Sequence, residues 1–344
     1  HLVKRQMEKI PLFLYPQRNK GIFSTGLFGY DFTKTKEFSE ADIIHLHWIN
    51  DCFVNLKTLN KINKPIIWTM RDMWPITGGC HYSASCDHYK NGCGHCPKLA
   101  SNTKTDLSRF VLSRKKLLFP KEMTLVAMSS WLLDCAKEST LFKDYDTRHI
   151  PNNINSDFFF SVDKKTARKI LEIKTKKTIL LSGATHVNEV DKGFFEYLEA
   201  LKTLDRDKFF LCFFGNLDTG LIDQLGFEYK SFGYLFDHIS LSMVYSVADI
   251  FVAPSLYEAF GKTIVESMTC KTPVVCFDAT GPKDIVSHKI NGYKAIPYDS
   301  KDLAMGIEWI ANHLNYSDLC EAARKKAIEK YESKVIASQY LALY

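Results

Sequence analysis

Short apolar runs, separated by turns and amphipathic stretches, recur along the chain. Those interpreted as buried strands are residues 43–47, 65–70 and 124–128 in the first half, and 178–182, 209–214, 250–253 and 273–277 in the second. Short apolar runs bounded by turn residues are typical of strands in a parallel sheet, which helices cover on both faces. The pattern predicts strand–helix units and an α/β fold class.

Amphipathic segments between these runs predict the helices. Residues 193–204 carry four apolar side chains at helical spacing, as a helix packed on a sheet requires. These are Phe194, Tyr197, Leu198 and Leu201. Residues 241–247 predict a shorter helix, and a helix over about residues 108–119 is expected to project basic residues 114–116 from its surface.

A turn at residues 150–153 divides the pattern in two. Its proline and paired asparagines favour non-helical backbone, so we place a domain boundary there. Two Rossmann-like domains are expected, over residues 1–150 and 151–344. Open parallel sheets bind ligands at the carboxyl ends of their strands, so two such domains facing each other predict an interdomain cleft that holds the chemistry.

Composition and charge narrow the class of protein. No apolar stretch approaches the length of a membrane-spanning helix, and the first residues lack the apolar core of a signal peptide, so a cytoplasmic protein is expected. Residues 1–150 hold 22 Lys and Arg against 14 Asp and Glu, whereas the remainder is nearly balanced. A basic half attracts an anionic membrane, a phosphate-bearing acceptor or nucleic acid, or is a plain solvated surface.

The segment from Ala253 to Glu266 joins a strand to a helix. Pro254 ends the strand, Gly261 permits a tight turn, and helical spacing begins at Lys262. Free backbone N–H groups at the start of that helix favour a diphosphate.

Two carboxylates flank this turn. Glu258 precedes the helix and Glu266 lies about one turn inside it, so each can accept hydrogen bonds from sugar or ribose hydroxyls. The alternative is an acid favoured by the helix dipole and a second, solvated one.

These residues resemble the motif P-S-x-x-E-x-F-G-x-x-x-x-E of family-4 retaining glycosyltransferases, which have the GT-B fold. The matching positions are Pro254, Ser255, Glu258, Phe260, Gly261 and Glu266, then residues 272–275, then Gly281, Asp284, Ile285, Val286, Asn291 and Gly292. The chain departs from the family pattern at Lys271 and Thr280, where glycine is usual. The resemblance implies that residues 151–344 bind the donor, and that the last helix packs back on the first domain.

The resemblance also assigns roles. It implies that Glu266 holds the ribose hydroxyls, that Glu258 lies near the transferred sugar, and that Lys192 neutralises the leaving diphosphate. Glu258 and Lys192 are thus the catalytic candidates on this side. Residues 231–234 resemble the turn that contacts the base, although a plain strand-end turn has a similar sequence. The donor-binding set is Gly183, Lys192, Gly233, Tyr234, Glu258, Ala259, Phe260, Gly261, Lys262, Thr263 and Glu266.

The reaction implied by the resemblance is transfer of a sugar, with retention, from a UDP- or GDP-sugar to a hydroxyl of a saccharide or lipid-linked saccharide. No cofactor is required for catalysis, because helix N–H groups and Lys192 replace a divalent ion. A catalytically silent subunit that only binds the nucleotide sugar is the alternative. A nucleic-acid partner is not expected, because the tryptophans of the first half sit beside strands and are not interleaved with a basic stripe.

The first half resembles the subgroup of these enzymes that builds bacterial surface polysaccharides. Where that subgroup commonly has His-Asp after a strand, this chain has Arg71-Asp72. Arginine stays protonated, so Asp72 is the catalytic acid candidate and Arg71 an anion-binding group on the acceptor side; a buried ion pair is the alternative. His45 and His47 are interpreted as sheet residues, not catalysts. The family's first strand–helix–strand unit is not visible before Ile43, so the chain is either truncated or diverged there.

Four cysteines fall within a glycine-rich loop: Cys80, Cys86, Cys93 and Cys96. Four thiolates can hold a structural zinc ion tetrahedrally, and the C-x2-C half has the spacing of a zinc knuckle. The first pair is spaced more widely than usual, so disulfides and unligated thiols remain alternatives.

Overall fold

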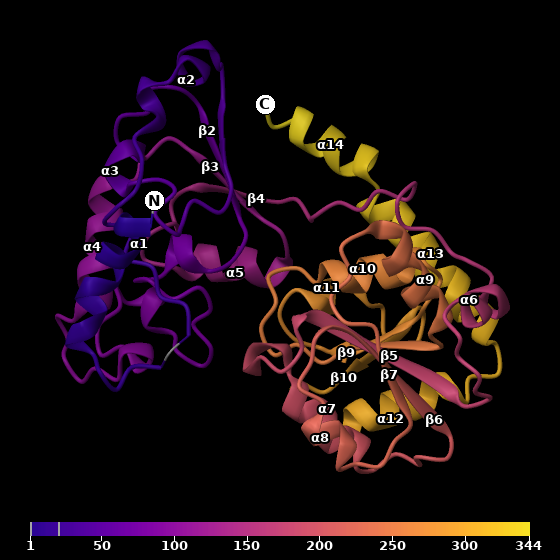
Figure 1. The fold of residues 1–344 in the computed structure, drawn as a ribbon. Coiled ribbons are helices and arrows are strands. Elements are labelled where there is room, and N and C mark those ends of the chain that lie inside the picture. The colour runs from indigo at the N-terminus through magenta and orange to yellow at the C-terminus, as the bar shows by residue number, and fades with distance from the viewer. Residues whose placement is uncertain (1, 20) are drawn as a thin grey trace. The chain divides into compact units, whose positions relative to one another are not determined.

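The computed structural model describes residues 2–19 and 21–344. Contacts between residues divide the chain into two compact units, His1–Ile150 with Tyr344, and Pro151–Leu343 (Figure 1). Each unit is built on one parallel β-sheet with helices around it, which confirms the predicted α/β class.

The first unit has a four-stranded sheet in the order β1-β2-β3-β4, and every pairing in it is parallel. Its strands are β1 (Ile44–Leu46), β2 (Ile66–Met70), β3 (Thr124–Ala127) and β4 (Asp146–His149). Its α-helices are α1 (Leu2–Lys9), α2 (Lys36–Glu40), α3 (Leu56–Leu59), α4 (Leu107–Leu118) and α5 (Ser130–Glu138), and its short 3₁₀ helices are η1 (Ile10–Leu14), η2 (Phe32–Lys34), η3 (Trp74–Ile76), η4 (His88–Lys90) and η5 (Pro97–Leu99).

The second unit has a six-stranded parallel sheet in the order β10-β9-β8-β5-β6-β7. Its strands are β5 (Thr178–His186), β6 (Phe209–Asn216), β7 (Tyr229–Ser231), β8 (Ile250–Ala253), β9 (Val274–Phe277) and β10 (Gly292–Ala295). Its helices are α6 (Lys164–Ile170), η6 (Val190–Lys192), α7 (Phe194–Leu201), α8 (Gly220–Asp223), α9 (His238–Val247), α10 (Lys262–Thr269), α11 (Pro282–Ile285), α12 (Ser300–Ala311), α13 (Tyr316–Tyr331) and α14 (Ser333–Leu341). Helices α7 and α12 cover one face of the sheet, and α9, α10 and α13 cover the other (Figure 1).

Burial explains why the central strands were visible in the sequence. The strands β2, β8 and β9 are buried at every position. The chain starts this sheet in the middle at β5, builds outward through β6 and β7, and then returns to the other side of β5 with β8. The order of strands therefore reverses between β5 and β8.

One expectation for the first unit is wrong. Lys115 does not project from α4 but is fully buried, because it shares the inward face of the helix with Val111 and Leu112. Its ammonium group donates to the carbonyls of Trp74 and Thr77 and lies 3.5 Å from the centre of the Trp74 ring. Burial lowers the pKa of Lys115 to about 7.

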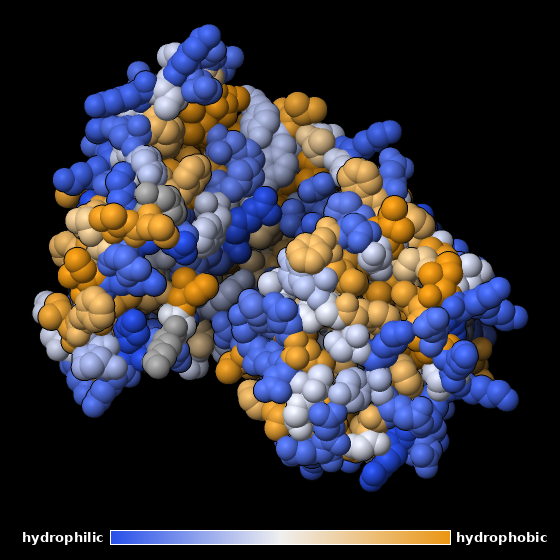
Figure 2. Space-filling model, in the orientation of Figure 1, coloured by the Kyte–Doolittle hydropathy of each residue, from blue (hydrophilic) through white to orange (hydrophobic). Residues whose placement is uncertain are grey.

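None of the helices in the described residues combines the length and the apolar character needed to cross a membrane. On the face drawn in Figure 2, hydrophobic side chains form separate patches among hydrophilic ones.

Candidate functional site

A pocket of 380 Å³ opens in the second unit where the strand order reverses. The ends of β5 and β8 line it, through residues 182–187 and 251–255. In open parallel sheets this reversal point, at the carboxyl ends of the strands, is the place where ligands bind. Five of the predicted donor-binding residues line the pocket: Gly183, Lys192, Glu258, Lys262 and Thr263.

Two of these residues form an ion pair. The Lys192 ammonium lies 2.7 Å from the Glu258 carboxylate, and about a quarter to a third of each side chain is exposed. Burial alone would lower the pKa of Lys192, but Glu258 and the nearby Glu189 and Asp191 outweigh it, so the pKa is raised. Lys192 is therefore a fixed cation in the pocket.

A close backbone contact brings this pair together. A Cβ atom at Gly193 would lie 1.8 Å from the carbonyl oxygen of Pro254, and Gly193 has a left-handed φ of 67°. The N–H of Leu256 also donates to the carbonyl of Asp191, over 3.0 Å. Only glycine permits the turn after Lys192 to press against the end of β8 in this way.

Helix α10 begins beside the pocket. Its N-cap is Gly261, with a φ of 109°, and among the described residues no side chain caps the helix start. The first acceptor within the helix is the Gly261 carbonyl, which accepts a hydrogen bond from the backbone N–H of Ile264. The N–H groups before that position, including that of Thr263 in the pocket wall, have no acceptor within the helix, and such groups favour an anion.

Glu266 lies on α10 but not in the pocket wall, and it is only 6% exposed. It accepts a hydrogen bond of 2.9 Å from the Tyr245 hydroxyl, and the Lys262 ammonium lies 3.6 Å away. Burial raises the pKa of Glu266, although Lys262, Tyr245 and His238 oppose the shift.

The remaining predicted donor residues do not line the pocket. Ala259 and Phe260 are buried, and the Phe260 ring packs edge-on against Tyr331. Gly233 follows β7 with a left-handed φ of 66°, and Tyr234 beside it is 45% exposed. The proposed contact of this turn with a base stays a prediction.

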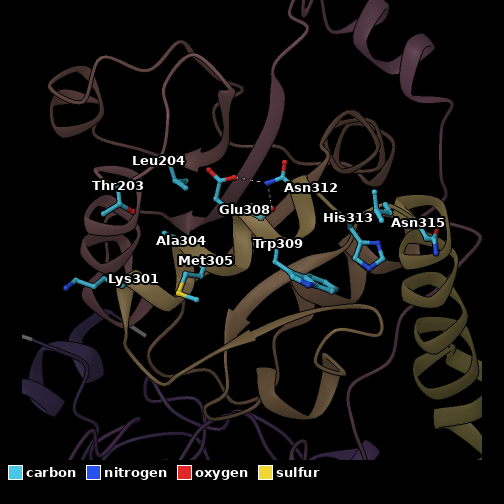
Figure 3. Close-up of a pocket in the computed structure, with 11 residues that line it drawn as sticks. Thr203, Leu204, Lys301, Ala304, Met305, Glu308, Trp309, Asn312, His313 and Asn315 are labelled. Atoms are coloured by element: carbon cyan, nitrogen blue, oxygen red, sulfur yellow. Dashed lines mark hydrogen bonds between the residues drawn. The ribbon is translucent and has the colours of Figure 1, made fainter.

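A larger pocket, of 920 Å³, lies on the same unit along α12, beside the residues that follow α7 (Figure 3). It holds none of the predicted residues, and Trp309 and His313 form its aromatic wall.

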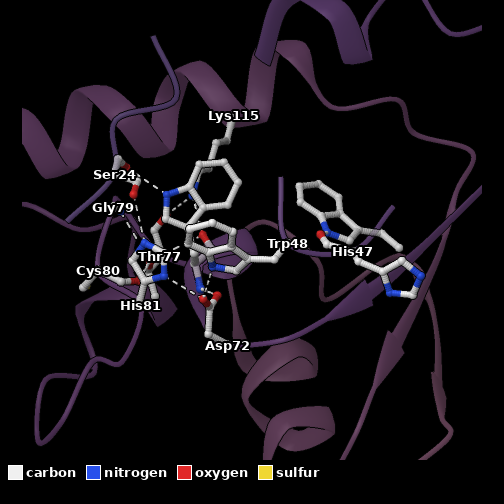
Figure 4. A network of polar contacts seen from close by, with 11 residues as sticks. Ser24, His47, Trp48, Asp72, Thr77, Gly79, Cys80, His81 and Lys115 are labelled. Carbon is white, nitrogen blue, oxygen red and sulfur yellow. Dashed lines mark hydrogen bonds and ion pairs between the residues drawn. The ribbon is translucent and has the colours of Figure 1, made fainter. Parts of the chain in front are cut away.

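In the first unit, polar side chains gather where β1 and β2 end. Arg71 follows β2, and its guanidinium lies 3.3 Å from His47 Nδ1. Asp72 is buried and binds Trp48 and His81, neither of which the sequence had singled out as a site residue (Figure 4). The only available signal was the position of Trp48 and Asp72 just after two adjacent strands.

The four clustered cysteines are free thiols, and burial raises the pKa of Cys93 to about 12 and of Cys96 to about 11. Cys80 and Cys96 are buried, whereas Cys86 and Cys93 are partly exposed. Within residues 2–19 and 21–344, no group of three or more His, Cys, Asp or Glu side chains is arranged to hold a metal ion. The zinc site remains a prediction from spacing alone.

Residues 163–330, all within the second unit, match the family described as Glycosyl transferases group 1. An uncharacterised glycosyltransferase of Methanocaldococcus jannaschii is 31% identical over 106 residues, which are 30% of this chain and 27% of the relative. A protein of Escherichia coli named as a colanic acid biosynthesis glycosyl transferase is 29% identical over 24% of this chain and 23% of its own length. The matched segments thus span about a quarter of these curated relatives.

Two solved structures are similar over most of the chain. Sucrose-phosphate synthase from Thermosynechococcus elongatus has a TM-score of 0.70 at 21% identity, covering 88% of this chain and 73% of the other. HepE from Anabaena, in complex with UDP and glucose, has a TM-score of 0.65 at 18% identity, covering 90% and 78%. At these identities the likeness shows the fold, which is that of GT-B glycosyltransferases.

Replacing Gly193 should disturb the pocket. We expect Gly193→Ala to lower the free energy of unfolding by more than about 1 kcal/mol, because the added methyl group collides with the Pro254 carbonyl and φ is positive. Gly220→Ala is the matched control, since its Cβ would approach nothing closer than 3.5 Å. Urea unfolding of both variants measures the difference, and equal effects would contradict this account of the turn.

Replacing Glu266 should change how stability depends on pH. Its pKa is raised in the folded state, so the folded protein binds this proton more tightly than the unfolded chain, and stability is lost as pH rises from about 4.5 through the raised pKa. Glutamine does not titrate, so we expect the melting temperature of Glu266→Gln to increase relative to that of the wild type as the pH rises through this range. Glu199→Gln, at an exposed position, is the control; a pH-independent difference for Glu266→Gln would refute the assignment.

Proposed function

We propose that this chain is a retaining glycosyltransferase that moves a sugar from a nucleotide-diphosphate sugar to a hydroxyl group, in the biosynthesis of a bacterial polysaccharide or glycolipid. The observation that carries the proposal is the pocket between β5 and β8, where a lysine, a carboxylate and an uncapped helix start converge. The group 1 domain over residues 163–330 supports it.

Each part of the pocket has a task in such a transfer. Departure of a nucleoside diphosphate builds negative charge, which the Lys192 ammonium and the N–H groups at the start of α10 stabilise without a divalent ion. Glu258 reaches the same pocket and accepts hydrogen bonds from the hydroxyls of the transferred sugar. Glu266 is proposed to hold the ribose, and Tyr245 fixes its carboxylate.

The donor is proposed to be a UDP- or GDP-sugar, and the UDP bound in the HepE structure supports the first. The Escherichia coli relative's name supports a saccharide or lipid-linked saccharide acceptor.

We propose that the protein works in the cytoplasm, at the surface of an anionic membrane. The exposed side chains of Phe13 and Leu14, which are close in sequence to Lys9, support this membrane contact. Binding of the protein to anionic vesicles at low and at high salt tests it.

Donor binding is the first test. Because a ligand that binds the native state raises its stability, one of UDP, GDP and ADP or their sugars should raise the melting temperature of the wild type. Glu266→Ala should lose that shift. A panel in which no nucleotide raises the melting temperature would rule out the proposed donor site.

Turnover is the second test, and it separates an enzyme from a subunit that only binds donor. We expect Lys192→Met to lower kcat by about 10²–10³-fold, because it removes the cation that stabilises the leaving diphosphate. Lys202→Met, at an exposed lysine of the same unit, should retain activity. Equal turnover of Lys192→Met and wild type would contradict the role, whereas donor binding without any turnover would leave only a binding subunit.

A further inference from the structure

Trp48 is an exposed aromatic side chain whose orientation is nonetheless fixed. It lies two residues after β1 and is 43% exposed. Its indole N–H donates to Asp72 Oδ2 over 3.0 Å, so the polar edge of the ring is tied down while part of its surface faces solvent.

The anchor of Trp48 is itself held from several sides. Asp72 is 6% exposed, and its Oδ1 accepts the backbone N–H of Trp74 over 2.8 Å. Its Oδ2 also lies 2.6 Å from His81 Nδ1. A carboxylate only accepts hydrogen bonds, so Nδ1 carries the proton and donates. With three donors on a buried carboxylate, Asp72 has little capacity left for a ligand.

A third layer fixes the histidine. His81 is 6% exposed, and its Nε2 lies 2.9 Å from the Ser24 hydroxyl, which is also buried. The Ser24 backbone is in turn pinned, because its N–H donates to Gly79 and its carbonyl accepts from the Trp74 indole. Ser24, His81 and Asp72 therefore form one chain of contacts that ends at the exposed Trp48 ring (Figure 4).

The surroundings of Trp48 are those of a binding surface. His47 precedes it, is exposed, and lies beside Arg71 at the end of the neighbouring strand. The carboxyl ends of β1 and β2 thus present one fixed aromatic face and a set of hydrogen-bonding groups on the same sheet edge. This edge is where parallel sheets bind ligands.

We propose that Trp48 is the stacking platform for a pyranose ring of the saccharide acceptor, and that Asp72 is a positioning residue that holds the platform through its indole N–H. The proposal rests on the proposed function, because it names the acceptor of that reaction as a saccharide. A pyranose ring has an apolar C–H face that packs on an aromatic ring, and hydroxyls around its rim that His47 and Arg71 can meet. A preoriented ring costs less to order when the sugar binds.

The test uses the whole chain labelled with 5-fluorotryptophan. Because the chain has five tryptophans, it gives five fluorine resonances. The Trp48 resonance is the one missing in Trp48→Phe. Methyl pyranosides of glucose, galactose, mannose, rhamnose and N-acetylglucosamine are titrated in turn, with glycerol as a hydroxyl-bearing control that lacks a ring. We expect at least one pyranoside, and not glycerol, to shift the Trp48 resonance.

Variants separate the platform from its anchor. Trp48→Leu should abolish binding of that pyranoside, whereas Phe53→Leu, at another exposed aromatic of the unit, should leave it intact. Asp72→Asn removes one hydrogen-bond acceptor, so it should move the Trp48 resonance in the free protein and lower the affinity for the pyranoside about tenfold. Weaker binding with an unmoved Trp48 resonance would overturn the positioning role.

Failure of this proposal is distinguishable from failure of the proposed function. If no pyranoside shifts the Trp48 resonance while a nucleotide still raises the melting temperature, the platform is overturned and the donor site stands. If a pyranoside shifts the resonance but no nucleotide binds, the saccharide site stands and the transferase function falls.

Discussion

The contact between Gly193 and the Pro254 carbonyl is the constraint on which the pocket depends. It presses the turn that carries Lys192 against the end of β8, and the next turn of chain then supplies Glu258. The two charged groups are 66 residues apart in sequence and meet because the backbones of their segments touch. A side chain at position 193 would separate them. The meeting of Lys192 and Glu258 thus depends on a steric condition at one residue.

The sequence revealed all the interior strands of the two sheets but only one of their four edge strands. The interior strands β2, β3, β5, β6, β8 and β9 were predicted because burial on both faces demands continuous apolar runs. The edge strand β1 was predicted as well, from the apolar run at residues 43–47. The missed strands, β4, β7 and β10, all lie at sheet edges. Their sequences, DTRH, YKS and GYKA, carry polar and charged residues, which an edge strand tolerates because one side of it meets solvent. These edge strands are held by hydrogen bonds to the neighbouring strand, and their own sequences contain no pattern that predicts such pairing.

The same limit applies to the sites. The proposed donor pocket was predictable in part, because Glu258, Lys262 and Thr263 fall in one contiguous strand–helix junction. The network around Trp48 was not, because Ser24, Asp72 and His81 come from separate segments that only the fold assembles. Lys115 is the clearest case. It stands between two other basic residues, and nothing in the local sequence indicated that its ammonium group would be buried against the carbonyls of Trp74 and Thr77. Local sequence predicts chemistry along the chain, whereas contacts across it require the structure.

The ion pair between Lys192 and Glu258 means that the charges of these two side chains already balance each other in the pocket. In the proposed function, a diphosphate competes with Glu258 for the Lys192 ammonium, and where it displaces the carboxylate, that group needs new hydrogen-bond donors. The hydroxyls of an attached sugar are such donors, whereas a bare nucleoside diphosphate brings none to that position. In the proposed function, the ion pair therefore opposes binding of the spent nucleotide more than binding of the intact donor, which would favour product release.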